Sequence, residues 1–157
     1  MNASHVTSSE VDTRRVARGF GKGLGRGDVV ALYGDLGTGK TQFVKGLCSA
    51  FGVRELVASP TFVILHRYGG SDRQGKELLV YHFDLYRVQS RAEIFDLGYE
   101  EFFFGDGICV VEWADRLHEL LPDARYDVHM SLGGREDERR IDITRVFTNG
   151  STMRKSS

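Results

Sequence analysis

The segment GDLGTGKT, residues 34–41, constrains the fold of this chain more than any other part of the sequence. It follows the continuous apolar run DVVALY. It precedes residues 40–51, where Phe43, Leu47 and Phe51 recur at the spacing of an amphipathic helix. Glycines lack Cβ atoms, so backbone amides at a helix N-terminus can surround phosphate oxygens. The segment therefore predicts a strand, a phosphate-binding loop and a helix in direct succession.

The chemistry of this loop favours a nucleoside triphosphate with magnesium. In the pattern G-x-x-x-x-G-K-[ST], the lysine reaches the β- and γ-phosphates and the hydroxyl residue binds the metal. Lys40 and Thr41 hold these two positions. The predicted nucleotide-binding residues of the loop are Gly34, Gly37, Thr38, Gly39, Lys40, Thr41 and Gln42.

Strand-like and helix-like segments alternate along the rest of the chain. Further strands are expected at 61–68, 77–84 and 108–113, and a C-terminal hairpin at 128–143. Helices are expected at 13–24, 90–103 and 114–121, the second of them opened by the capping box of Ser90 and Glu93. The predicted fold is α/β, a P-loop NTPase-like three-layer domain with a mixed sheet that has a parallel core and antiparallel hairpins.

Length and composition indicate one domain. We expect a flexible N-terminus at 1–9, a single domain at 10–146 and a disordered tail at 147–157. The two cysteines, Cys48 and Cys109, lack metal-ligand spacing and are expected to be buried thiols. The N-terminus has no apolar signal segment and no run reaches the length of a membrane span, so we expect a cytoplasmic protein without a membrane partner.

The charge balance argues against a free-standing nucleic-acid binder. The chain has 21 basic and 22 acidic residues, a net charge of −1. Proteins that bind nucleic acid alone usually have a basic excess, because neutralising phosphates supplies most of their non-specific affinity. Any nucleic acid is therefore expected to be held by a partner.

Two acids stand where a magnesium–nucleotide site needs them. Asp84 and Glu112 each end an apolar strand, and open α/β sheets bind ligands at the carboxyl ends of their strands. One would hold the metal and the other would orient the attacking water. Spacing leaves the two roles unassigned, and a strand-end carboxylate that only faces solvent is the alternative for either.

Four further residues have both a functional and a structural interpretation. His82 shares a strand face with Asp84 and is expected to support that carboxylate or to be a half-buried structural histidine. Thr61 would face the γ-phosphate or cap a turn. Arg87 would contact phosphate or a partner, or remain solvated. Trp113 would serve the site or pack on the sheet.

Absent motifs narrow the class of nucleotide-binding protein. No N-K-x-D or T-K-x-D segment is present to read guanine, which favours ATP, and no LSGGQ-like stretch indicates a transporter subunit. A small P-loop kinase remains the alternative, although the region after Asp84 leaves little chain for a lid. A nucleotide-sensing module without hydrolysis is the third interpretation.

Four motifs in order resemble one family. GDLGTGKT, SPTF at 59–62, HFDLYR at 82–87 and VVEWADR at 110–116 are similar to the motifs of TsaE. TsaE is the bacterial ATPase that takes part in threonylcarbamoyladenosine modification of tRNA at adenosine 37. The resemblance spans about residues 10 to 143.

The resemblance implies a single-domain ATPase with ATP and Mg²⁺ as cofactors, slow alone and dependent on its partners, the TsaD–TsaB pair. Transfer RNA would be reached indirectly through that complex. The resemblance assigns magnesium to Thr41 and Glu112, makes Asp84 the second catalytic acid, and places base contacts near Glu10 and Gly134. Nucleotide state would act as a switch on the partner.

Overall fold

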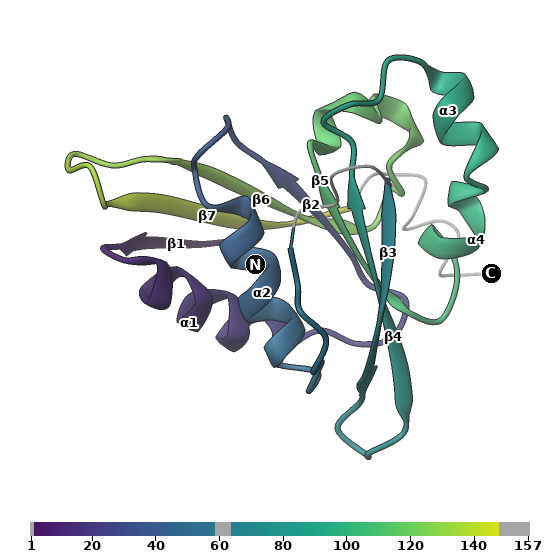
Figure 1. Cartoon of the computed structure of the whole chain (residues 1–157), viewed down its shortest axis with the longest axis horizontal. Helices are drawn as coiled ribbons and strands as arrows, with labels where there is room; N and C mark the ends of the chain where they lie inside the picture. The colour runs from purple at the N-terminus through teal and green to yellow at the C-terminus, as the bar shows by residue number, and fades with distance from the viewer. Residues whose placement is uncertain (1, 59–63, 148–157) are drawn as a thin grey trace.

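The computed structural model describes residues 2–58 and 64–147, and these build one seven-stranded sheet (Figure 1). The spatial order of its strands is β1-β7-β6-β2-β5-β4-β3. The strands are β1 (Asn2–Thr7), β2 (Val29–Tyr33), β3 (Leu65–Ser71), β4 (Glu77–Asp84), β5 (Ile108–Glu112), β6 (Arg125–Leu132) and β7 (Arg139–Val146). The helices are α1 (Glu10–Gly21), α2 (Lys40–Ser49), α3 (Arg91–Asp96) and α4 (Tyr99–Phe103), with short 3₁₀ turns η1 (Ala114–Arg116) and η2 (His118–Leu120).

The pairing confirms the predicted mixed α/β sheet. Strands β6, β2, β5 and β4 are parallel neighbours, whereas β3, β7 and β1 pair antiparallel at the two edges. Strands β2 and β5 are central because their apolar runs can be buried on both faces. Because these two strands are parallel, their carboxyl ends meet at one edge of the sheet.

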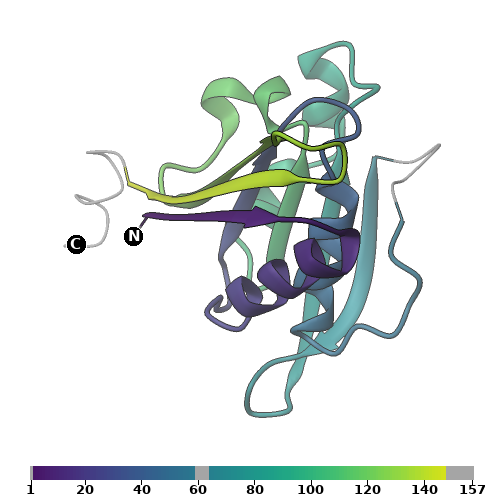
Figure 2. The same ribbon diagram turned by 90° about the vertical axis from the view of Figure 1, so that its left-hand side faces the viewer.

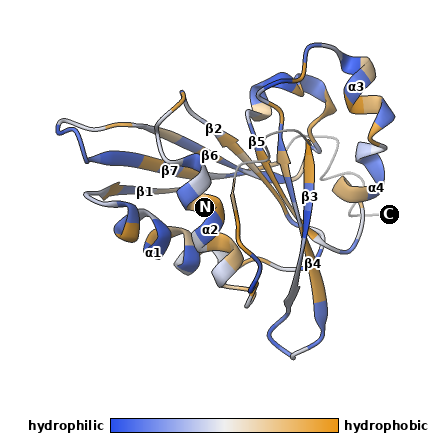
Figure 3. Ribbon diagram, in the orientation of Figure 1, coloured by the Kyte–Doolittle hydropathy of each residue, from blue (hydrophilic) through white to orange (hydrophobic). Residues whose placement is uncertain are grey.

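Helices cover both faces of this sheet (Figures 1 and 2). α1 and α2 pack on a core that includes Val30 and Leu32 of β2, and α3, α4 and η1 pack on a second core that includes Val29 and Ala31. Alternate residues of one strand thus supply both cores. Figure 3 shows hydrophobic residues concentrated in the middle of the sheet and hydrophilic residues at the β3–β4 turn.

The N-terminal segment corrects one prediction. Residues 1–9 were expected to be flexible, but Asn2–Thr7 forms β1 and pairs with β7, from Asn2 opposite Thr144 to Thr7 opposite Arg139. Only Thr7 of this strand is buried. The strand is held by backbone pairing with a distant segment, which leaves no apolar alternation in the local sequence.

Three helical predictions also need correction. α1 begins at Glu10 and not at residue 13, because the Ser9 hydroxyl accepts a hydrogen bond from the Asp12 amide. The single helix expected at 90–103 is two short helices, since Gly98 takes a left-handed φ of 68° between them. The helix expected at 114–121 is the pair of 3₁₀ turns.

Other predictions are confirmed or fall outside the described residues. The β3–β4 and β6–β7 hairpins are present, and both cysteines are free and buried. Within residues 2–58 and 64–147, no helix combines the length and the apolar character needed to cross a membrane. The N-terminal part of the strand expected at 61–68 and residues 148–157 of the predicted tail lie outside the described residues.

Candidate functional site

The loop between β2 and α2 has a backbone that requires glycine. Gly34, Gly37 and Gly39 have φ angles of 151°, 85° and 98°, a region that side chains disfavour. A Cβ atom on Gly34 would lie 2.6 Å from the carbonyl oxygen of Met130 and 2.7 Å from Thr38 Oγ1. The loop is therefore pressed against β6 and opens at the N-terminus of α2, where amide donors are available to an anion.

Lys40 is folded into this loop. Its side chain is buried, and Nζ donates hydrogen bonds to the carbonyl oxygens of Gly34 at 2.5 Å and Asp35 at 2.9 Å. The ammonium also lies 4.1 Å from the ring centroid of Trp113. Burial lowers the pKa of Lys40, and the nearby carboxylates of Glu112 and Asp84 act in the opposite direction. The loop thus concentrates one cation where phosphates would bind.

Thr41 and Glu112 meet at the edge of the sheet. Glu112 is the last residue of β5 and pairs in register with Leu32, near the end of β2 that leads into the loop. The Thr41 hydroxyl donates to Glu112 Oε1 over 3.3 Å. Glu112 is 2% exposed, so this carboxylate is directed into the protein toward the loop and not into solvent.

Asp84 lies beside Glu112 on the neighbouring strand. The two residues are register partners in the parallel β4–β5 pair, which brings both predicted acids to the same edge. Asp84 is half-buried and its Oδ1 accepts a hydrogen bond from the Tyr86 amide at 3.0 Å. Tertiary pairing therefore assembles two carboxylates that are 28 positions apart in the sequence.

His82 has a different partner from the one we predicted. It is fully buried and not half-buried, and Nε2 lies 2.5 Å from Glu112 Oε2. Its other ring nitrogen, Nδ1, lies 3.5 Å from the Tyr68 hydroxyl. The imidazole thus contacts the carboxylate of β5, because Glu112 is diagonal to His82 across the parallel pair, whereas Asp84 is two residues along the same strand.

Trp113 and Arg87 flank the two acids. Trp113 has a left-handed φ of 58°, which turns its ring over Lys40, and its ring centroid lies 5.0 Å from that of Tyr86. Trp113 therefore belongs to the site as well as to the packing. Arg87 is exposed in the segment after β4.

The remaining predicted residues lie on elements around the loop. Gln42 Oε1 accepts a hydrogen bond from Arg14 Nη1 at 2.6 Å, which ties α1 to the start of α2. Glu10 is the exposed first residue of α1, and Gly134 lies in the β6–β7 turn, with its amide donating to Glu138 Oε1. Thr61 lies outside the described residues.

Two further residues that contact the predicted site residues were not predicted from the sequence. Arg14 reaches Gln42 from α1, and Arg139 Nη2, at the turn end of the β6–β7 hairpin, donates to the Gly37 carbonyl at 3.1 Å. Neither position has a local motif. An arginine in an amphipathic helix or at the start of a strand is common, so only the three-dimensional contact distinguishes them.

These residues fit a magnesium–nucleotide. Mg²⁺ prefers oxygen ligands and usually keeps one or two protein ligands together with phosphates and water. The Thr41 hydroxyl and the Glu112 carboxylate provide such a pair beside a glycine-shaped anion cradle. In the part of the chain that the structure describes, no group of three or more His, Cys, Asp or Glu residues is arranged to hold a metal by itself.

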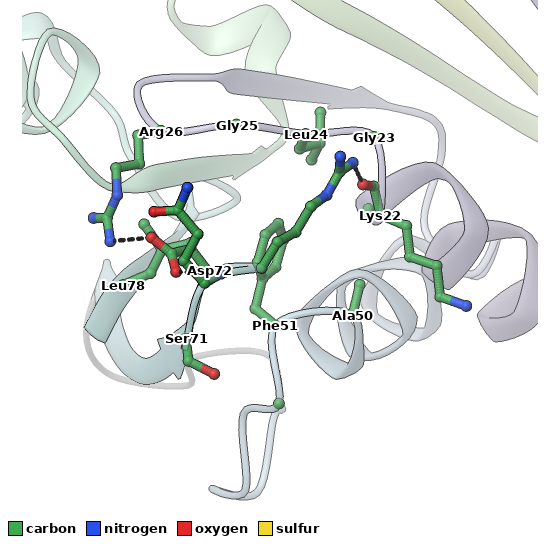
Figure 4. A pocket seen from close by; sticks show the side chains of 14 residues that line it. Lys22, Gly23, Leu24, Gly25, Arg26, Ala50, Phe51, Ser71, Asp72 and Leu78 are labelled. Carbon is green, nitrogen blue, oxygen red and sulfur yellow. Dashed lines mark hydrogen bonds and ion pairs between the residues drawn. The ribbon is translucent and has the colours of Figure 1, made fainter. Parts of the chain in front are cut away.

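A separate pocket of about 550 Å³ lies at the other end of α2 (Figure 4). Phe51 and Leu78 contribute apolar surface to it, and Arg26 and Asp72 form an ion pair of 2.7 Å at its rim. The pocket contains none of the loop residues and neither strand-end acid. The chemistry needed for a nucleotide is therefore at the loop and not in this pocket.

Comparisons with known proteins identify one family. The model of the family described as "Threonylcarbamoyl adenosine biosynthesis protein TsaE" matches residues 7–141. A Bacillus subtilis protein named "tRNA threonylcarbamoyladenosine biosynthesis protein TsaE" is 39% identical over 140 residues, which cover 89% of this chain and 84% of that protein. A Treponema pallidum protein of the same name is 42% identical over 127 residues, covering 81% and 88%.

A solved structure extends the similarity to three dimensions. The crystal structure of Bacillus subtilis YdiB superimposes with a TM-score of 0.76 at 33% sequence identity, covering 98% of this chain and 90% of that one. The match of the family model over most of the chain, the relatives and the shared fold lead to one conclusion. The chain belongs to the TsaE family, which acts in the biosynthesis of threonylcarbamoyladenosine in tRNA.

Proposed function

We propose that this chain is a Mg²⁺-dependent ATPase that works with the TsaD–TsaB complex in the threonylcarbamoyladenosine modification of tRNA, in the cytoplasm. The observation that carries the ATPase proposal is the contact between Thr41 and Glu112 at the mouth of the glycine loop. It brings together a hydroxyl and a buried carboxylate from separate elements, next to the cation of Lys40. The partners are inferred from the family role.

Each residue of the site would have a separate role. Thr41 and Glu112 would hold magnesium, which when bound offsets the negative charge of the phosphate oxygens. Lys40 would exchange the carbonyl oxygens of Gly34 and Asp35 for phosphate oxygens. Asp84, in register with Glu112, would orient the attacking water.

Hydrolysis would act as a switch on the complex. Loops that contact a γ-phosphate and its metal change their order when the phosphate leaves, and a partner reads the difference. Trp113 directly follows Glu112, Tyr86 lies two residues after Asp84, and the two rings are in contact with centroids 5.0 Å apart, so a change at the acids would move an aromatic surface. The net charge of −1 supports contact with tRNA through the complex.

Phosphate release separates the proposal from its alternatives. The purified chain is expected to release phosphate from ATP slowly alone and faster with TsaD and TsaB, and Glu112→Ala should abolish the increase. Rapid turnover with a small-molecule acceptor and no partner would instead indicate a kinase. Tight ATP binding without phosphate release under any condition would indicate a sensor.

A further inference from the structure

A chain of polar side chains crosses the buried interior behind the loop. Tyr68 on β3, His82 on β4 and Glu112 on β5 are each 2% exposed or less. Glu112 Oε2 contacts His82 Nε2 at 2.5 Å, His82 Nδ1 contacts the Tyr68 hydroxyl at 3.5 Å, and Glu112 Oε1 accepts from Thr41 at 3.3 Å. Buried side chains from three neighbouring strands are thus connected to Thr41, one of the two proposed magnesium ligands.

The neighbours on this side of the sheet are apolar. Val80 and Val110 flank His82 along the same face and are fully buried. An imidazole in this position loses its hydration and is costly unless both ring nitrogens are hydrogen-bonded. Both flanking residues are aliphatic, so the polar contacts are what distinguish His82 from its neighbours.

The donor and the acceptor of each hydrogen bond in this series of side chains can be assigned by starting from the carboxylate. An ionised carboxylate only accepts hydrogen bonds, so Nε2 of His82 carries the proton shared with Glu112. Nδ1 is then an acceptor for the Tyr68 hydroxyl. Burial raises the pKa of Tyr68, which keeps that hydroxyl protonated, whereas the Ala58 backbone acts on this pKa in the opposite direction.

We infer that His82, held by Tyr68, is a positioning residue that fixes one oxygen of Glu112 so that the other is presented to Thr41 and the magnesium. The inference deepens the proposed function and rests on it. Partners that orient metal ligands in this way commonly account for a 10- to 100-fold effect on metal affinity or activity. His82 would therefore act through Glu112 and not as a ligand of the nucleotide or the metal.

The test measures the Mg²⁺ dependence of binding the non-hydrolysable analogue β,γ-imido-ATP by titration calorimetry. His82→Leu is expected to raise the Mg²⁺ concentration for half-maximal binding about 10- to 100-fold, with binding in EDTA unchanged. His82→Gln is expected to recover most of the loss, because its amide nitrogen can donate from the place of Nε2. Tyr68→Phe should give a smaller increase in the same direction.

Controls separate positioning from folding. His66→Leu replaces the register partner of His82 on β3 and should leave the Mg²⁺ dependence unchanged. Thermal unfolding of each variant reports whether the fold is kept. If His82→Leu does not fold, Tyr68→Phe and His82→Gln decide: equal Mg²⁺ dependence in Tyr68→Phe and wild type overturns the inference.

Two results distinguish failure of the inference from failure of the proposed function. If Glu112→Gln weakens Mg²⁺-dependent binding while His82→Leu does not, the inference is wrong and the function stands. If Glu112→Gln also has no effect, the magnesium assignment itself falls. A ¹⁵N spectrum of the ligand-free protein gives an independent readout, since His82 should be protonated on Nε2, and protonation on Nδ1 alone would overturn the assigned polarity.

Discussion

A single methyl group at Gly46 should decide how closely α1 and α2 pack. A Cβ atom there would lie 2.2 Å from the Arg14 carbonyl oxygen and 2.8 Å from the Ala17 Cβ. These contacts are shorter than atoms can tolerate, and one of them is to backbone, so α1 as a whole would have to move. The hydrogen bond from Arg14 to Gln42 would move with it.

Two opposing effects set the magnitude for Gly46→Ala. Alanine is favoured over glycine in a helix interior by about 1 kcal/mol, whereas forcing extra volume into a packed contact costs about 1–3 kcal/mol. Because backbone and not a flexible side chain is in the way, we take the upper end of the cost. The net loss is then about 2 kcal/mol, or roughly 4–8 °C in Tm for a chain of this size.

Gly19→Ala on α1 is the matched control. No atom lies within 4 Å of a Cβ built there, so only helix propensity acts and the gain is about 0.5–1 kcal/mol. Urea unfolding of both variants gives the comparison through the midpoint at constant slope. If Gly46→Ala were as stable as wild type or more stable, close helix packing would not be what requires glycine there.

Three further predictions concern the site and the buried thiols. Lys40→Ala should weaken nucleotide binding by about 1.5–3 kcal/mol, while Lys45→Ala on the same helix should not; equal binding by both variants would refute the role of Lys40. Asp84→Asn should keep nucleotide affinity but reduce partner-stimulated phosphate release about 100-fold or more, so a normal rate would exclude it as the water-orienting group. Burial raises the pKa of Cys48 and Cys109 to about 12 from 9.0. The unfolded chain therefore loses these protons first and the free energy of unfolding should fall as pH rises from 9 toward 12; replacing both with alanine should remove this part of the fall, and an unchanged profile would contradict it.

Local sequence was sufficient where one element carries its own signal. The apolar run of β2, the glycine loop and the amphipathic α2 were predicted in order because each pattern acts on near neighbours. β1 was missed because an edge strand with one buried residue has no apolar alternation. Gly98 was read as part of a helix because a lone glycine is tolerated in many helices.

The candidate site shows the same division. Its two acids were predicted because strand ends meet at one edge of a parallel sheet. The partner of His82 was not predicted correctly. His82 and Asp84 share a strand face, which favoured Asp84 as the partner, and only the register between β4 and β5 brings Glu112 to Nε2 of His82. Arg14 and Arg139 were missed because their contacts with the loop cross 28 and 102 positions of sequence.

The sequence by itself determined the glycine loop between β2 and α2, the fold class, the two strand-end acids and the resemblance to the TsaE family, because these depend on residue type at short spacing. The tertiary structure decided which of these side chains contact one another. It placed Glu112 between Thr41 and His82, turned Trp113 over Lys40, and laid the β6–β7 hairpin against the loop. The physical reason is strand register and close packing, which join residues far apart in the chain and leave no trace in the local pattern around any one of them.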